Sequence, residues 1–229
     1  MFKFRSYTPE LLDGSDIPEL DLFQNLKELH FINKYLGGYR ITFDALKKLI
    51  HQSNSNYSIV DIGSGGGDTL KEIYTWCISR KINTELFGID LKQSCVNYSN
   101  QNNPKPAIKF INDDYENALK HIENIDFIHA SLFCHHLNEE QIISLIHFAQ
   151  KNKATLIIND LERNPIAYYS IKVLTNLFSK SYLVKNDAPL SVLRGFKKRE
   201  WLAIIKQSGA HKFTVKNMWA FRHQVIIYA

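Results

Sequence analysis

The chain has 229 residues, 45% of them hydrophobic, which is enough to bury the core of one large domain. Its net charge of +5 is mild and its three cysteines show no C-x-x-C spacing, so we expect no nucleic-acid surface, disulfide framework or structural zinc. The sequence shows no apolar leader and no run long enough to span a membrane, which favours a cytoplasmic protein.

The first 51 residues are predicted to form an irregular arm and a helical lid ahead of the core. Helix breakers are frequent in residues 1–18, which we expect to lie over another part of the molecule. Apolar periodicity predicts one helix over residues 20–36, stopped by two glycines. A second helix is predicted over residues 42–51, with Thr42 as its N-cap.

Residues 59–68 read as a β-strand that breaks into a glycine-rich turn and continues as an amphipathic helix. This order is typical of the ligand-binding corner of a doubly wound α/β sheet. The spacing is D-x-G-x-G-x-G from Asp61 to Gly67, whereas a dinucleotide fingerprint would place its third small residue at Asp68. A carboxylate there suits a cationic ligand without phosphate. A turn that binds NAD, or nothing, is the alternative.

Further strands are predicted over residues 86–90, 108–111, 125–129 and 155–158. Asp90 ends the first of these, 23 residues after Gly67, a spacing that suits a carboxylate accepting both hydroxyls of a ribose. It has a competing role as N-cap of the helix that starts at Gln93. Another helix is expected to begin near Asn138.

The last third of the chain is predicted to continue with a helix over residues 165–178 and a loop through residues 187–195. A helix over 199–207 and a strand pair over 212–219 and 223–228 follow. The long segment at about 163–196 interrupts the alternation of strands and helices. We interpret it as a substrate-side insertion.

The loop from Asp61 to Gly67 resembles motif I of the class I S-adenosylmethionine (SAM) methyltransferases. The resemblance implies a Rossmann-like α/β fold with a seven-stranded mixed sheet flanked by helices. It also implies a helical lid over residues 1–51, a core over 52–229, and SAM as cofactor with S-adenosylhomocysteine (SAH) as product. The residues that the resemblance places at the cofactor are Asp61, Gly63, Ser64, Gly65, Gly67, Asp90, Leu91, Asp114, Tyr115, Ala130 and Arg40.

Two sets of segments resemble narrower groups within these methyltransferases. Residues 32–40 look like the segment ahead of motif I in ubiquinone/menaquinone-type methyltransferases, where an arginine, here Arg40, holds the SAM carboxylate. Residues 131–137, 158–163 and 187–196 look like segments of small-molecule methyltransferases found with type III polyketide synthases. The resemblance implies O-methylation of an aromatic, apolar acceptor by a monomer or homodimer. C-methylation and a non-catalytic SAM-binding regulator are the alternatives.

His135 and His136 follow the fourth strand at the edge where the methyl group should lie, so histidine is the candidate base. His136 is the first candidate for contact with the acceptor, and His135 is the second. Packing against neighbouring residues is the competing role for both. A metal site built from these two and His129 is not expected, because Cys134 is the only carboxylate or thiolate ligand at metal spacing beside them. Arg163 and Arg194 are interpreted as surface ion pairs, with acceptor binding as the alternative.

Overall fold

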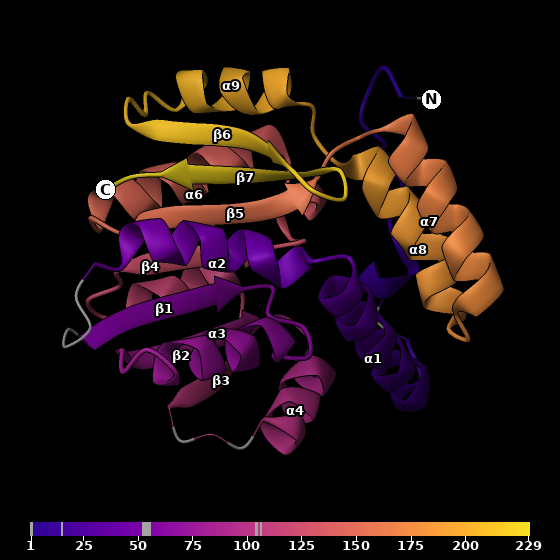
Figure 1. Cartoon of the computed structure of the whole chain (residues 1–229), viewed down its shortest axis with the longest axis horizontal. Coiled ribbons are helices and arrows are strands. Elements are labelled where there is room, and N and C mark those ends of the chain that lie inside the picture. The colour runs from indigo at the N-terminus through magenta and orange to yellow at the C-terminus, as the bar shows by residue number, and fades with distance from the viewer. Residues whose placement is uncertain (1, 15, 52–55, 104, 106) are drawn as a thin grey trace.

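The computed structural model describes residues 2–14, 16–51, 56–103, 105 and 107–229, and Figure 1 shows its layers around one sheet. Seven strands pair in the order β3-β2-β1-β4-β5-β7-β6. The strands are β1 (Asn56–Ile62), β2 (Asn83–Asp90), β3 (Ile108–Asn112), β4 (Phe127–Ser131), β5 (Thr155–Leu161), β6 (Phe213–Met218) and β7 (Arg222–Ile227). The first five are parallel, and β7 runs antiparallel between β5 and β6. The predicted seven-stranded mixed sheet is confirmed.

Helices cover both faces of this sheet, which explains why consecutive residues are apolar at 59–60, 127–128 and 156–158 in its central strands. The helices are η1 (Leu11–Asp13), α1 (Glu19–Tyr35), α2 (Gly38–Leu49), α3 (Asp68–Ile78), α4 (Gln93–Asn102), α5 (Tyr115–Ala118), η2 (Leu119–His121), η3 (Cys134–His136), α6 (Glu139–Lys151), α7 (Pro165–Phe178), α8 (Tyr182–Arg194) and α9 (Lys198–Gln207). Ile59 of β1 packs with α2 and α3 on one face, while Val60 packs with α6 and α9 on the other. Adjacent residues of one strand therefore feed two separate cores.

The parallel strands all end at one edge of the sheet, and the remaining helices gather there. Figure 1 shows α1, α7 and α8 on the right, beyond the arrowheads of β1 and β5. Helix α8 packs against α7, α1 and η1, so the N-terminal arm and residues 165–194 meet over this edge. In open α/β sheets, ligands bind outside the carboxyl ends of the strands.

Two local predictions were wrong. Helix α2 begins at Gly38 instead of Thr42, because Gly37 takes the left-handed conformation (φ 74°) before it. Residues 187–195 were predicted as a loop, but residues 187–194 lie in α8, which contains Pro189. A proline removes one helical hydrogen bond, and here the Ser181 cap and the burial of Val184 and Val192 outweigh that loss.

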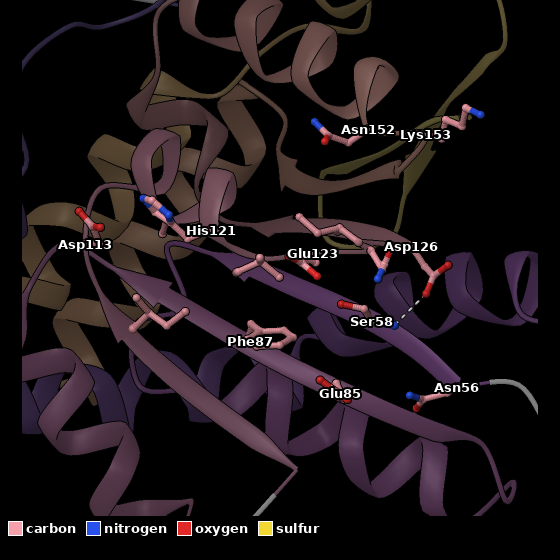
Figure 2. A pocket seen from close by; sticks show the side chains of 15 residues that line it. Asn56, Ser58, Glu85, Phe87, Asp113, His121, Glu123, Asp126, Asn152 and Lys153 are labelled. Carbon is pink, nitrogen blue, oxygen red and sulfur yellow. Dashed lines mark hydrogen bonds between the residues drawn. The ribbon is translucent and has the colours of Figure 1, made fainter.

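A polar hollow of about 810 Å³ lies over the first halves of β1 and β2, where α5 is too short to cover the sheet. Figure 2 shows acidic side chains around it, with the Asp126 carboxylate accepting a hydrogen bond from the backbone of Ser58. None of the cofactor or catalytic residues predicted from the sequence lines it. Within the described ranges, no helix is both long and apolar enough to cross a bilayer.

Candidate active site

The turn between β1 and α3 contains three glycines with positive φ, at Gly63 (64°), Gly65 (53°) and Gly67 (71°). A side chain at Gly63 would overlap the ring of Phe133, with two ring carbons 2.9 Å from its Cβ. A side chain at Gly65 would meet only Leu26, at 3.7 Å, and would otherwise point into open space. The first glycine therefore permits close packing, and the second leaves room for a ligand.

This turn borders a cavity of about 470 Å³ at the carboxyl edge of the sheet. Most of the predicted cofactor residues meet at this cavity. Those that line it are Asp61, Gly63, Ser64, Gly65, Asp90, Leu91, Asp114 and Tyr115. Three others do not line it: Gly67 precedes α3, Ala130 is fully buried in β4, and Arg40 is exposed on α2.

Asp90 holds the loop and faces the cavity at the same time. Its Oδ2 accepts a hydrogen bond of 2.8 Å from the Gly65 N–H, and its Oδ1 accepts one of 2.9 Å from the Lys92 N–H. Burial raises the pKa of Asp90, while these two hydrogen bonds oppose the rise. The carboxylate does not cap α4, whose N-cap is Lys92 with no side-chain cap bond. Each oxygen keeps a second lone pair for a ligand.

Asp114 and Tyr115 stand where β3 leads into α5. The Asp114 carboxylate caps α5 by accepting a 2.8 Å hydrogen bond from Glu116, and it also lines the cavity. Tyr115 is buried and meets the Phe133 ring edge-on at 5.4 Å. The large Tyr115 side chain therefore forms part of the cavity wall.

Both ring nitrogens of His129 have hydrogen-bond partners beneath the glycine loop, and His129 does not line the cavity. Its Nδ1 lies 2.7 Å from Asp61 Oδ1 and its Nε2 lies 2.9 Å from Thr42 Oγ1. All three side chains are buried. The hydroxyl that was predicted to cap a helix instead links α2 to β4 and β1.

His135 is fully engaged with the end of β5. Its Nδ1 lies 2.7 Å from Asp160 Oδ1, and its backbone N–H donates to Asp160 Oδ2 at 2.9 Å. Burial lowers the pKa of His135, but the charge and hydrogen bonds of Asp160 and the charge of Glu10 outweigh it and raise the pKa to about 9. The Nε2 of His135 lies 3.6 Å from Glu10 Oε1.

His136 is less buried and contacts the N-terminal arm. Its Nδ1 lies 3.1 Å from Asp13 Oδ1, and its Nε2 lies 3.9 Å from Glu10 Oε2. The two histidine rings are 4.3 Å apart. The arm thus brings two carboxylates to a histidine pair that is more than 120 positions away in sequence.

A second cavity of about 480 Å³ lies beside the first, between α1, α7, α8 and the turn from β6 to β7. Its walls are mostly apolar, with Leu36, Leu174 and Trp219 among them. Four residues line both cavities: Leu12, Leu29, Leu132 and His136.

Leu132 marks this junction with an unusual backbone. Its φ of 53° lies in the left-handed region, which is strained for a bulky side chain. A hydrogen bond of 2.9 Å from its N–H to the Asn159 carbonyl fixes the turn. The strain is located where the two cavities meet.

A buried arginine that sequence reasoning missed, Arg222, lines the apolar cavity. Its guanidinium donates to Asn33 Oδ1 at 2.7 Å and to Asn159 Oδ1 at 3.4 Å. Burial lowers the pKa of Arg222 to about 10, against the attraction of Asp160. No sequence pattern pointed to this residue, because it opens an ordinary strand.

Arg163 and Arg194 were expected at the surface, and the structure corrects this. Arg163 is fully buried, pairs with both oxygens of Glu200, and donates to the Phe2 carbonyl at 3.1 Å. Arg194 is also buried and donates to the Thr8 carbonyl at 3.0 Å. Both cations hold the N-terminal arm in place.

Comparisons with known proteins agree with this geometry. Residues 59–153 match the sequence family described as "Methyltransferase domain", and no curated protein matches the chain significantly. The plantazolicin methyltransferase BpumL in complex with SAH superposes with a TM-score of 0.63 at 17% identity, covering 92% of this chain and 96% of that one. A SAM-dependent methyltransferase from Aquifex aeolicus gives 0.59 at 15% identity, covering 90% and 97%. The citrinin polyketide synthase CMeT domain gives 0.54 at 15% identity, covering 81% and 49%.

Proposed function

We propose that this chain, which carries a SAM-dependent methyltransferase domain on the class I fold, methylates a small, apolar, aromatic acceptor on oxygen. One observation carries the proposal: the polar cavity at the glycine loop and the apolar cavity beside it share His136 and three leucines as walls. A methyl donor in the first cavity and an acceptor in the second would meet at these residues, which is the geometry that direct transfer needs.

The residues of the first cavity fit SAM. Gly65 leaves room above the loop, Asp90 offers acceptor oxygens to a ribose diol, and Asp114 lies at the end of the next strand. The Ser64 hydroxyl is buried and has no hydrogen-bond partner among the described residues, so it is free to bond a ligand. When bound, SAM supplies a methyl group already activated by its sulfonium. The protein then needs mainly to orient the acceptor and exclude water.

The second cavity fits a planar, apolar acceptor with one ionisable oxygen. Leucine, isoleucine and aromatic side chains from α1, α7 and the β6–β7 turn make up most of its wall. The Arg222 guanidinium has only neutral amide partners at hydrogen-bond distance within the described ranges. A buried cation without a direct counter-ion favours a ligand with a negative oxygen.

His136 is the residue that we assign to the acceptor hydroxyl. It lines both cavities, and Asp13 holds its Nδ1, which leaves Nε2 to accept a proton. His135 is a positioning residue: Asp160 fixes its ring, and the ring packs against that of His136. His136 would take the proton of the acceptor hydroxyl as its oxygen displaces SAH from the methyl carbon of SAM.

Calorimetric titration with SAM and SAH tests the cofactor site. We expect micromolar binding by the wild type and its loss in Gly65→Arg and Asp90→Ala. Gly209→Arg is the matched control, because Gly209 also has a positive φ (72°) and nothing lies within 4 Å of its Cβ position. Binding that survives Gly65→Arg would refute the assignment of the cavity.

A panel of phenols, quinones and pyrones then tests the acceptor, with SAH release and product mass as readouts. Methylated oxygen in the product would support the proposal, and a new C–CH₃ bond would overturn its O-methylation part. Tight SAM binding without turnover on any acceptor would favour the non-catalytic regulator. His136→Gln is expected to lower kcat by about 10²–10⁴-fold, the usual contribution of a general base.

A further inference from the structure

We propose that Glu10, His135 and His136 form a binding site for one divalent transition-metal ion at the junction of the two cavities. The three side chains come from the N-terminal arm and from η3, and their candidate ligand atoms all lie within 4.8 Å of one another. Two imidazoles and one carboxylate are a ligand set that suits zinc, iron, cobalt or manganese. The proposal adds a metal to the methyl-transfer site described above, and its acceptor role rests on that proposed function.

The spacing of the donor atoms is close to that of a filled site. In tetrahedral coordination with metal–ligand distances of about 2.0–2.1 Å, neighbouring ligand atoms are about 3.3–3.4 Å apart. Here the Glu10 carboxylate oxygens lie 3.6 Å from His135 Nε2 and 3.9 Å from His136 Nε2. Contractions of a few tenths of an ångström would bring both ring–carboxylate separations into this range, and the candidate ligand atoms of the two rings lie within 4.8 Å of each other.

The same separations are too long for hydrogen bonds, whose heavy-atom distances are about 2.7–3.2 Å. Both rings nevertheless direct Nε2 toward one carboxylate, with Glu10 and His135 almost fully buried. A chain of hydrogen bonds would draw these atoms together. A gap of this size between three potential ligands leaves room for an ion between them.

The opposite nitrogen of each ring is held by a carboxylate, as metal-binding histidines usually are. Asp160 lies 2.7 Å from Nδ1 of His135, and Asp13 lies 3.1 Å from Nδ1 of His136. Metal binding would release the Nε2 proton of His135, and these contacts would then keep Nδ1 protonated with the Nε2 lone pair pointing inward. Such outer carboxylates orient the rings and raise their basicity toward a metal.

The local charge also favours a cation. Glu10, Asp13 and Asp160 contribute three carboxylates around the two rings. Two guanidinium groups partly offset them: Arg194, 3.1 Å from Asp13 and 3.9 Å from Glu10, and Arg5, which donates to the His135 carbonyl. With both imidazoles neutral, one negative charge remains in excess, and Asp187 nearby adds another.

A metal here would be placed to bind the acceptor hydroxyl, because His136 lines both cavities and Glu10 lines the acceptor cavity. Three protein ligands leave a fourth position open for such an oxygen. A bound cation lowers the pKa of a hydroxyl that it coordinates. The hydroxyl proton would pass to solvent, and the resulting phenolate oxygen would displace SAH from the methyl carbon of SAM. His136 would then act as a ligand, and its role as a free base would apply only to the metal-free protein.

The test is direct titration of the chelator-treated protein with Zn²⁺ by calorimetry and with Co²⁺ by visible absorption. We expect one equivalent to bind, with a d–d spectrum of a low-coordinate cobalt site. Glu10→Gln and His136→Gln should weaken binding by at least about tenfold. Asp160→Asn should weaken it by about 10–100-fold through the ring it holds. His211→Gln is the matched control, since His211 is exposed and lies outside the cluster.

Absence of stoichiometric binding by the wild-type protein would overturn the proposal, and this result does not depend on the folding of any variant. Binding that the Glu10 and His136 variants leave unchanged would place the metal elsewhere and also overturn it. SAH titration of the same samples separates this outcome from failure of the proposed function, because Gly65 and Asp90 are not part of the cluster. Retained SAH binding without metal binding would refute only the metal site.

Discussion

Replacing Gly63 with alanine should destabilise the protein through two separable effects. The first is conformational: φ is 64° at this position, and a left-handed backbone costs an L-residue about 1–2 kcal/mol. The second is steric, because the new methyl group would overlap the Phe133 ring, with two ring carbons at 2.9 Å. Overpacking of this kind typically costs about 1–3 kcal/mol. We therefore expect Gly63→Ala to lower the free energy of unfolding by about 2–5 kcal/mol.

Two other glycines provide matched controls. Gly209→Ala meets the same backbone cost (φ 72°) but no atom within 4 Å, so it should lose only about 1–2 kcal/mol. Gly65→Ala should lose a similar amount of stability, since its Cβ lies 3.7 Å from Leu26. Unlike the other two, it should weaken SAM binding directly, because the methyl group enters the cavity.

Equilibrium denaturation in urea measures all three free energies, with the slopes compared to confirm that each variant unfolds as the wild type does. Adding Phe133→Leu to Gly63→Ala should recover part of the steric loss, and this coupling isolates the contact. A Gly63→Ala loss equal to that of Gly209→Ala within about 0.5 kcal/mol would show that the ring yields freely. That result would refute the claim that this glycine is required by packing.

Two further predictions concern charged groups. Arg163→Met should lower the free energy of unfolding by about 3 kcal/mol, the low end for a broken buried ion pair, because Glu200 keeps partial access to solvent. The control Arg199→Met, at an exposed position, should change the free energy of unfolding by no more than about 0.5 kcal/mol. Equal losses in the two variants would contradict the role of the buried ion pair. The Asp68 carboxylate, 3.6 Å from Nδ1 of His30, raises the pKa of His30 against partial burial. Its stabilising effect is therefore complete below the unfolded pKa of about 6.5 and disappears as pH rises through the raised value. His30→Gln should destabilise the protein at about pH 5 and have little effect at about pH 9, and a loss independent of pH would argue against the ion pair.

The sequence was sufficient to predict the central sheet because the evidence for it is local. A buried strand, a glycine turn and an amphipathic helix all lie within residues 59–78, and each has its own periodicity. The strand ends at Asp90 and Asp114 meet at one cavity for a topological reason: parallel strands share a carboxyl edge. The same reasoning placed His136 near the cofactor cavity.

The remaining site residues escaped prediction because their contacts are long-range. Glu10 and Asp13 belong to an arm with no periodic pattern, and nothing local places them against His136. Arg222 opens a strand whose neighbours in space are Asn33 and Asn159, both far away in sequence. Such contacts depend on how layers stack over the sheet edge, which single-sequence periodicity does not record.

The helix α8 was missed for a different reason. The segment was predicted as a loop and contains Pro189, but a proline within a helix costs mainly one hydrogen bond and some steric strain. That cost is offset when the helix lies between α1, α7 and η1 and buries Val184, Val192 and Arg194. Tertiary packing therefore decided the structure of this segment, and local propensity did not.

The N-terminal arm links the stability of the protein to the shape of the site. Buried Arg163 and Arg194 donate to the Phe2 and Thr8 carbonyls of the arm. Arg5 of the arm donates in turn to the His135 carbonyl in the η3 turn. Removing the arm would take the Phe2 carbonyl from buried Arg163, and the Thr8 carbonyl and the Asp13 carboxylate from buried Arg194, which is costly. The arm also supplies Leu12 to both cavities and Glu10 to the histidine pair. The interactions that fix the arm therefore also complete the walls of the site, so variants that loosen it should affect stability and ligand binding together.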